Sequence, residues 1–347
     1  MFPGEVLIAR VATSRMIRSY AFTTAGKLHT QDIDVFLMPI LLADTNLFLW
    51  VDLENSTPEE TRQILGGVFH FHQLSIEDCI HDSPSPKVDT FDPKEEDMFA
   101  PYLFMVIHGV NYNRADGVFA TSELNFFLGR NFLVTYHNAP LRSITQVEER
   151  CVRTGGLVAR APDRVAHALL DSLVDNYKPA LEELGEEIAS LEELVMKDPT
   201  PPTLLRILAV KKEVQHLRKI IGPQREVLAR FARGEFKIIR PHLMPYYRDV
   251  YDELFHISEL AQTYTDSLTG TLQTYLNVAA NHQGEVIKVL TMITILGTPA
   301  TIIASWYGMN FKSISELEWR HGYAFAIGLT VLSTLGTVVY FKRKKWL

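Results

Sequence analysis

Two uncharged runs of 19 residues constrain the fold of this chain most strongly. They cover residues 289–307 and 323–341, and neither contains Asp, Glu, Lys or Arg. About 20 apolar residues are needed for a helix to cross the hydrocarbon core of a bilayer. Aromatic residues stand at the edges of both runs, as in the interfacial belts of membrane helices: Trp306, Tyr307, Trp319, Tyr323, Tyr340 and Trp346. We therefore predict two transmembrane helices rather than two buried helices of a soluble core.

The basic residues beside these runs predict their orientation. Lys288 and residues 342–345 supply five positive charges on one side, whereas the connecting loop 308–322 contains Lys312 and Arg320. By the positive-inside rule, both termini and the basic tail 342–347 lie in the cytoplasm and the loop lies outside. The first twenty residues lack a signal-peptide pattern. We expect a multi-pass membrane protein with both termini in the cytoplasm.

Charge and cysteine content exclude several classes of function. The chain has 34 Lys+Arg against 41 Asp+Glu, a net charge of -7, which argues against nucleic acid as a partner. Cys79 and Cys151 are far apart and form no CxxC pair, so neither a disulfide framework nor a cysteine zinc site is expected. Histidines such as His70 and His72 are not accompanied by an HExxH motif, and we do not expect an enzyme.

Residues 1–160 have the pattern of a mixed α/β cytoplasmic domain. A Thr57-Pro58-Glu59-Glu60 segment has the residues of a helix N-cap and first turn, and predicts a short helix to about Phe71. A second short helix is expected at 75–79. Short runs rich in β-branched and aromatic residues predict strands at 35–42, 47–53, 102–110, 124–128 and 131–136.

Beyond this domain the periodicity is helical. Residues 161–235 predict a helical hairpin, in which the first helix ends at Asp198-Pro199 and the second covers about 203–230. The first helix has an acidic face, which we interpret as a solvated surface in preference to a cation-attracting one: Glu182, Glu183, Glu186, Glu187, Glu192 and Glu193.

Residues 241–307 predict a long stalk helix that continues into the first membrane span. A helix of about 60 residues would be roughly 90 Å long, more than a globular domain needs. The fold class is therefore an α+β membrane protein whose long helix packs against copies of itself or crosses the membrane. Two membrane helices cannot enclose a water-filled path, so transport would require several copies around an axis.

A stripe of hydroxyl groups in the first span favours that helix as the lining of such a path. The stripe consists of Thr291, Thr294, Thr298, Thr301 and Ser305, at steps of three and four residues. Serine and threonine also mediate helix packing in lipid, and this alternative stays open.

The segment after the first span, Tyr307-Gly308-Met309-Asn310-Phe311, resembles the YGMNF signature of the CorA family of divalent-cation (magnesium) channels, within the GMN-motif superfamily. The resemblance extends over nearly the whole chain, including an acidic residue in the external loop, Glu316. It implies a homopentamer in the lipid bilayer of a bacterial or archaeal plasma (inner) membrane that carries Mg²⁺ and also Co²⁺ or Ni²⁺. It further implies a selectivity filter of Gly308, Met309 and Asn310. A ring of Asn310 amide oxygens would suit hydrated Mg²⁺, which sheds its water reluctantly.

A second resemblance lies in the N-terminal domain. Ser75-Ile76-Glu77-Asp78, followed by Pro86-Lys87-Val88-Asp89, is similar to the family's LxxED...PKV segment. It implies regulatory Mg²⁺ held between subunits by Glu77 and Asp78 of one and Asp249 of the next, which closes the pentamer. The alternatives are a solvated helix turn for the pair and an ion pair with Arg248 for Asp249.

The sequence departs from the family pattern along the expected pore. Gln273 stands where the family often has an acidic residue, Gly284 occupies a second polar lining position, and Thr298 a commonly bulky one. Leu290 is still apolar, so closure by dewetting would depend on it. The expected lining residues are Gln273, Leu290, Thr294, Thr298, Thr301 and Ser305. Two rival functions are a zinc transporter of the same superfamily, which would lack the interface carboxylates, and a two-span membrane sensor, which would not need Asn310.

Overall fold

The computed structural model describes residues 16–81, 83, 85–94, 98–113, 118–154, 156–309, 319–344 and 346. These residues belong to two compact units. The first unit combines residues up to 191 with residues 205–269, and the second combines 192–204 with residues from 270 onward.

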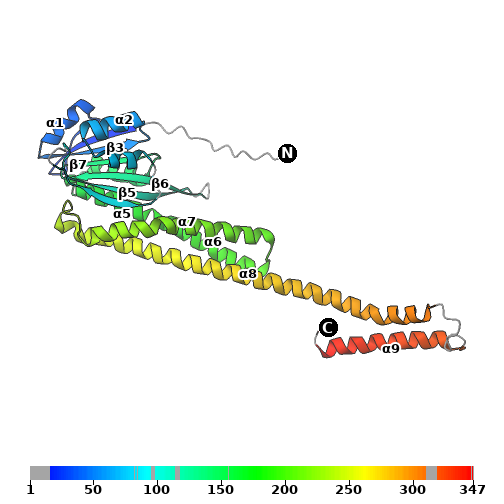
Figure 1. The fold of residues 1–347 in the computed structure, drawn as a ribbon. Helices are drawn as coiled ribbons and strands as arrows, with labels where there is room; N and C mark the ends of the chain where they lie inside the picture. The colour runs from blue at the N-terminus through cyan, green and yellow to red at the C-terminus, as the bar shows by residue number, and fades with distance from the viewer. Residues whose placement is uncertain are drawn as a thin grey trace. The chain divides into compact units, whose positions relative to one another are not determined.

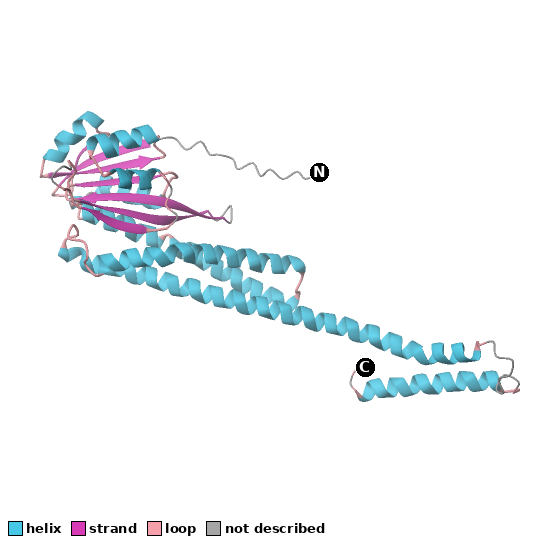
Figure 2. Cartoon of the chain, in the orientation of Figure 1, coloured by secondary structure: helices cyan, strands magenta, loops and turns pink. Residues whose placement is uncertain are grey.

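A seven-stranded sheet forms the centre of the N-terminal α/β domain, in the order β2-β1-β3-β7-β6-β5-β4. All neighbouring strands are antiparallel except β3 and β7, which are parallel (Figures 1 and 2). The strands are β1 (Met16–Thr23), β2 (Leu28–Gln31), β3 (Leu47–Glu54), β4 (Lys87–Phe91), β5 (Tyr102–Asn113), β6 (Val118–Gly129) and β7 (Phe132–His137).

Short helices cover both faces of this sheet. On one face, α2 (Pro58–Arg62) leads into a π-helical turn (Gln63–Val68), and this turn and α3 (Gln73–Ile80) share a buried core with alternate residues of β3. On the other face, α5 (Pro162–Asp175) crosses the sheet beside α4 (Arg142–Glu149). Gly109 of β5 permits this crossing, because a Cβ atom there would lie 2.5 Å from a methyl carbon of Leu173.

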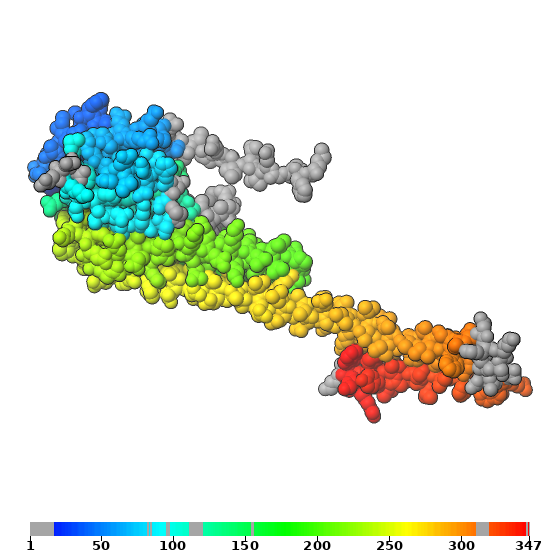
Figure 3. Space-filling model, viewed as in Figure 1, coloured from blue at the N-terminus to red at the C-terminus, as the bar shows by residue number. Residues whose placement is uncertain are grey.

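The expected strand at 35–42 is wrong. This segment forms a 3-10 turn (Val35–Leu37) and the short helix α1 (Met38–Ala43). The Asp34 carboxylate accepts a hydrogen bond from the Phe36 amide at 3.0 Å, and Pro39 in the first turn of α1 has no N–H for a strand ladder. The turn and α1 lie at the surface of the domain, in blue in Figure 3, with Phe36 83% exposed.

The predicted helix start at Thr57 is confirmed. Thr57 and Glu60 form a reciprocal capping box, and Pro58 is the first residue of α2. The α-helix itself ends at Arg62 and passes into the π-helical turn. The other predicted strands correspond to β3, β5, β6 and β7, of which β5 and β6 are longer than expected.

Four long helices follow the α/β domain. They are α6 (Tyr177–Lys197), α7 (Pro201–Ala232), α8 (Met244–Tyr307) and α9 (Gly322–Arg343). The expected first hairpin helix is divided at Asn176 into α5 and α6. Both α8 and α9 contain stretches long and apolar enough to cross a membrane, and the chain itself buries 0% and 6% of those stretches. Such surfaces require lipid or other copies of the chain around them.

Candidate functional site

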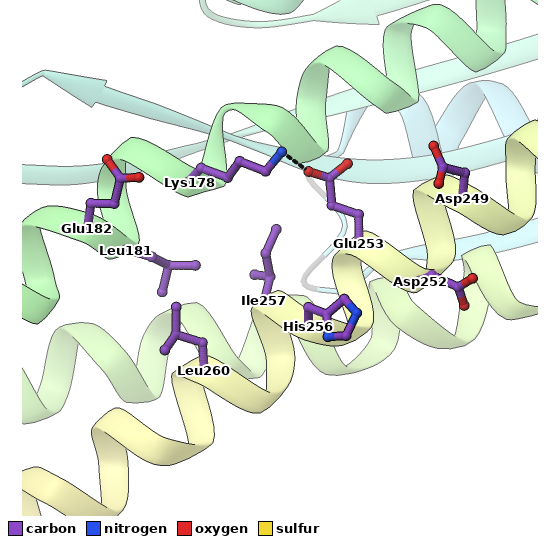
Figure 4. A pocket seen from close by; sticks show the side chains of 9 residues that line it. All are labelled: Lys178, Leu181, Glu182, Asp249, Asp252, Glu253, His256, Ile257 and Leu260. Atoms are coloured by element: carbon purple, nitrogen blue, oxygen red, sulfur yellow. Dashed lines mark ion pairs between the residues drawn. The ribbon is translucent and has the colours of Figure 1, made fainter.

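An acidic cavity of about 480 Å³ lies between α6 and α8 in the first unit. Figure 4 shows its walls: Lys178 and Glu182 project from α6, whereas Asp249 and Glu253 project from α8. The remaining lining residues are Leu181, Asp252, His256, Ile257 and Leu260. Asp249, which the family resemblance implied as a metal ligand, therefore belongs to a larger group of carboxylates.

The residue order along α8 explains why these side chains gather. Asp249, Asp252, Glu253 and His256 recur at steps of three and four and thus share one helix face. The neighbouring face consists of buried apolar residues that attach the helix to the domain: Val250, Leu254, Ile257 and Ala261. Asp249 is exposed and makes no ion pair with Arg248 or with any other residue that the structure describes.

Lys178 neutralises part of this acidic group. Its ammonium contacts Glu253 and lies 2.9 Å from an Asp175 carboxylate oxygen. Hydrogen bonds to Glu253 and Asp175 raise the pKa of Lys178, so the charge persists at neutral pH. Asp249 and Asp252 keep negative charges that no described cation neutralises.

Asp171 is a neighbour of Asp249 that the sequence reasoning missed. Burial raises the pKa of its carboxyl, and the charges of Asp175 and Asp249 add to that rise. The four-residue spacing of Asp171 and Asp175 on an otherwise buried helix was the available signal. Carboxylates that repel one another in this way are stabilised by a divalent cation, which prefers several oxygen ligands.

The expected partners of Asp249 lie on α3. Asp78 forms an ion pair of 2.6 Å with Lys87, and Glu77 is exposed and accepts a hydrogen bond from Gln73 at 3.2 Å. No described contact within the chain joins either residue to Asp249.

A different cluster brings together potential metal ligands within the described part of the chain. One ligand atom each from Asp52, Glu54 and His137 lies within 4.8 Å of the others. The guanidinium of Arg18 already contacts Asp52 at 2.8 Å and Glu54 at 3.0 Å. The positive charge of the Arg18 guanidinium takes the position that a metal ion would need. The cluster is therefore an ion-pair network inside the domain.

The expected pore residues share one face of α8. At about 100° per residue, Gln273, Leu290, Thr298 and the rest of the set fall within an arc of roughly 100°. Each threonine hydroxyl of the span donates to the carbonyl four residues earlier, for example Thr298 to Thr294 at 2.8 Å. These hydroxyl groups are therefore satisfied within the helix and keep an oxygen surface exposed: Thr294, Thr298, Thr301 and Ser305 are all exposed.

The second candidate membrane helix, α9, covers a different face of α8. A groove between the two helices is lined by Ala300, Ile303, Ala304 and Tyr307 of α8 and by residues of α9 such as Ala326. At about 100° per residue, Ile303 and Tyr307 are roughly 150–170° from the centre of the hydroxyl face, whereas Ala300 is about 130° and Ala304 about 90° from it. Within one chain, the hydroxyl face is thus not used for packing against α9.

The first residues of the signature motif, Gly308 and Met309, lie where α8 ends. The Gly308 amide donates to the Ala304 carbonyl at 2.9 Å, and a Cβ at Gly308 would lie 2.9 Å from the same oxygen. This glycine is required for close backbone approach and not for a left-handed conformation. Met309 is 44% exposed. Asn310 and Glu316 lie outside the described residues.

An α/β domain, a long helix, two candidate membrane spans and a Gly-Met-Asn motif define a class of two-span membrane proteins. Comparison with known sequences gives the family within that class. The family described as CorA-like Mg²⁺ transporter protein matches residues 46–343, and the chain belongs to this family. It is 31% identical to the cobalt/magnesium transport protein CorA of Thermotoga maritima, over 95% of this chain and 92% of that one.

Solved structures show the same fold. The complete CorA magnesium transporter of Methanocaldococcus jannaschii superimposes with a TM-score of 0.77 at 18% identity, covering 96% of this chain and 99% of that one. The cytoplasmic domain of ZntB from Vibrio parahaemolyticus superimposes with a TM-score of 0.58 at 14% identity, over 77% of this chain and 98% of that domain. The likeness to the complete CorA structure therefore extends over more of this chain than the likeness to the ZntB domain does.

Proposed function

We propose that this protein is a homopentameric Mg²⁺ channel that also carries Co²⁺ and Ni²⁺. In this proposal, α8 and α9 cross the plasma membrane, both termini are cytoplasmic, and five copies of α8 surround the path. Membership of the CorA-like family and similarity to a cobalt/magnesium transport protein support the choice of cargo.

The observation that carries the proposal is the two-sided character of α8. Its hydroxyl face is exposed within the chain, whereas a different face, centred on Ile303 and Tyr307, meets α9. A helix with hydroxyl oxygens on one side and a lipid-facing partner on the other is suited to line a wet path formed by several copies. Leu290, 63% exposed on the same face, supplies an apolar constriction that closes by dewetting.

The filter in this proposal is a ring of Asn310 side chains beyond the end of α8. Amide oxygens are neutral and accept hydrogen bonds from the hydration shell, so a partly hydrated Mg²⁺ passes without losing all its water. Gly308 and Met309 place this ring at the mouth, and Glu316 raises the local concentration of cations.

Closure in this proposal depends on cytosolic Mg²⁺ at the interface between subunits. Asp249 of one subunit and Glu77 and Asp78 of the next bind the ion, and repulsion within the Asp171, Asp175 and Asp249 group favours opening when the ion leaves. The unpaired charge of Asp249 and the raised pKa of Asp171 support this assignment.

Flux into liposomes tests the proposal. Purified protein is reconstituted, Mg²⁺ entry is followed with an internal indicator, and Co²⁺, Ni²⁺ and Zn²⁺ are added as competitors, with chemical cross-linking to count the copies. We expect Mg²⁺ entry that Co²⁺ and Ni²⁺ reduce, and cross-linked products up to five chains. Zn²⁺ entry without Mg²⁺ entry, or a largest product of two chains, would contradict it.

A further inference from the structure

A second cavity in the first unit has the opposite charge. It has a volume of about 600 Å³ and lies at the edge of the sheet where several connections meet. Its walls come from the β1–β2 turn, the α1–β3 connection, the β6–β7 turn, the start of α5 and the connection between α7 and α8. Five basic side chains line it: Arg130, Arg160, Arg164, Lys237 and Arg240.

Asp163, the acidic side chain that lines this cavity, is already neutralised. It is 4% exposed, and its two carboxylate oxygens accept hydrogen bonds from Arg240, at 2.8 Å from Nε and 2.6 Å from Nη2. This bidentate pair holds the connection after α7 against the start of α5. It leaves the positive charges of the other four basic residues without compensation.

The remaining four cations have no carboxylate partner in the part of the chain that the structure describes. Arg164 Nη2 lies 3.2 Å from His242 Nε2, and since the guanidinium can only donate, this histidine nitrogen accepts and the contact adds no negative charge. Arg130, Arg160 and Lys237 form no ion pair with described residues. Four like charges around one cavity repel, in a protein whose net charge is -7.

The start of α5 adds to the positive potential. Its N-cap residue, Ala161, makes no side-chain cap, and Pro162 is the first helical residue. The N-terminal end of a helix carries a partial positive charge that favours anions nearby. The cavity is thus a concave site surrounded by cations, with apolar surface from Phe48 and Ile238 on its wall.

We propose that this basic cavity binds a small molecule with a multiply charged phosphate group, as found on a nucleoside triphosphate or in free pyrophosphate. Guanidinium groups match phosphate oxygens in a bidentate manner, and Lys237 adds a point charge. A volume of about 600 Å³ is within the roughly 300–1,000 Å³ of small-molecule sites. The basic cavity shares no residue with the acidic cavity or with the hydroxyl face of α8. Its test is therefore separate from the test of the channel.

Isothermal titration calorimetry on the full-length protein in detergent tests this site. ATP, pyrophosphate and adenosine are titrated separately at a fixed free Mg²⁺ concentration, so that chelation by the phosphates does not change the occupancy of Mg²⁺ sites. We expect ATP and pyrophosphate to bind, with affinities that fall as salt is added, and adenosine not to bind. Equal affinities for ATP and pyrophosphate would show that the phosphate groups alone are sufficient for binding. Tighter binding of ATP would show that the site also recognises the nucleoside.

A pair of charge-matched variants locates the binding. Arg130→Gln with Lys237→Gln removes two exposed cavity charges, whereas Arg62→Gln with Arg153→Gln removes two exposed charges elsewhere in the domain. The first variant is expected to bind ATP about tenfold or more weakly, because two charge-assisted contacts are lost, and the second to bind like the unmodified protein. The proposal is overturned if neither phosphate binds at millimolar concentration, if adenosine binds as tightly as ATP, or if both variants lose affinity equally.

Discussion

His137 is a buried histidine whose two ring nitrogens both face acceptors. Nδ1 lies 2.7 Å from the Ala139 carbonyl oxygen, and Nε2 lies 3.3 Å from an Asp52 carboxylate oxygen. A neutral ring can donate to one of them, whereas an imidazolium donates to both. Burial opposes the charge on each partner, but their mutual attraction and hydrogen bond prevail, so the pKa of His137 is raised and that of Asp52 is lowered. Arg18, Glu54 and Thr135 complete the surroundings of this pair.

We predict that this histidine makes the stability of the α/β domain depend on pH. Because the pKa of His137 is higher in the folded state, its contribution is fully present below about pH 6.5 and is lost as pH rises through the folded value. His137→Gln should lower stability at pH 6 by about 3 kcal/mol and flatten the fall in stability above about pH 6.5. Thermal unfolding in detergent at a series of pH values measures both effects, with the exposed His29→Gln as control. An unchanged pH slope in His137→Gln would show that another group is responsible.

Asp249 is the residue on which closure depends in this account. Asp249→Asn removes part of the negative charge that binds Mg²⁺ and also part of the repulsion that favours opening. Binding of a hard dication depends steeply on carboxylate count, whereas repulsion between solvated carboxylates is screened, so loss of closure should dominate. We predict that cytosolic Mg²⁺ inhibits this variant only at roughly tenfold higher concentration or more.

The same variant should gain less protection from protease when Mg²⁺ is added, because a ligand stabilises only the state that it binds. Asp266→Asn is the matched control, since Asp266 is an exposed carboxylate of the same helix outside the acidic cavity. Inhibition and protection curves for Asp249→Asn that coincide with those of the control would remove Asp249 from the sensor.

At the scale of single elements, α8 has a polar face and a face that meets α9, and the two can be distinguished by cysteine accessibility. We predict that a positively charged thiol reagent blocks Mg²⁺ flux through Thr298→Cys and leaves Ile303→Cys unaffected, because position 303 lies in the groove against α9 and almost opposite the hydroxyl face. The native thiols should react little: both are buried, and burial raises the pKa of Cys151 to about 12 and that of Cys79 also well above its usual range. The reverse pattern of block would place the hydroxyl face away from the path.

Elements could be predicted from the sequence where their signals are local. The capping box at Thr57 and the proline stop after α6 depend on neighbouring residues, and both appear where expected. The prediction of a strand at 35–42 was wrong because an apolar run of this length suits a strand or a helix equally. Asp34 and Pro39 favour the helix. The break at Asn176 did have a local signal, which the helical periodicity concealed: Pro179 has no N–H to donate to the Asp175 carbonyl four residues earlier, and a helix cannot run through this point undisturbed.

The candidate sites also differ in whether their residues are adjacent in sequence. The motif at Gly308 is contiguous and could be recognised directly. The association of Asp171 with Asp249, and of Arg130 with Arg160 and Lys237, joins residues that are far apart in sequence. Such groups depend on how loops and helices pack, and hydrophobic periodicity carries no information about them.

At the scale of the proposed assembly, five copies of each pore residue would act as a ring. Gln273 is exposed on the same face of α8 as the hydroxyl stripe and carries no charge. We predict that Gln273→Asp raises divalent-cation flux several-fold at low ionic strength, because a ring of carboxylates concentrates cations at the inner mouth. The gain should shrink as salt is added, since the screening length falls from about 30 Å at 0.01 M to about 8 Å at 0.15 M. Flux measured across that range that never differs from the unmodified channel would place Gln273 off the path.

The central claim is that divalent cations pass through a ring of Asn310 side chains. The most direct measurement is Mg²⁺ flux into liposomes for Asn310→Ala, normalised to the amount of correctly assembled oligomer determined by cross-linking. We predict that assembly is unchanged and that flux falls to the background of empty liposomes, because the ring loses its amide oxygens while α8 and α9 keep their packing. Flux equal to that of the unmodified protein in an intact Asn310→Ala oligomer would contradict the claim.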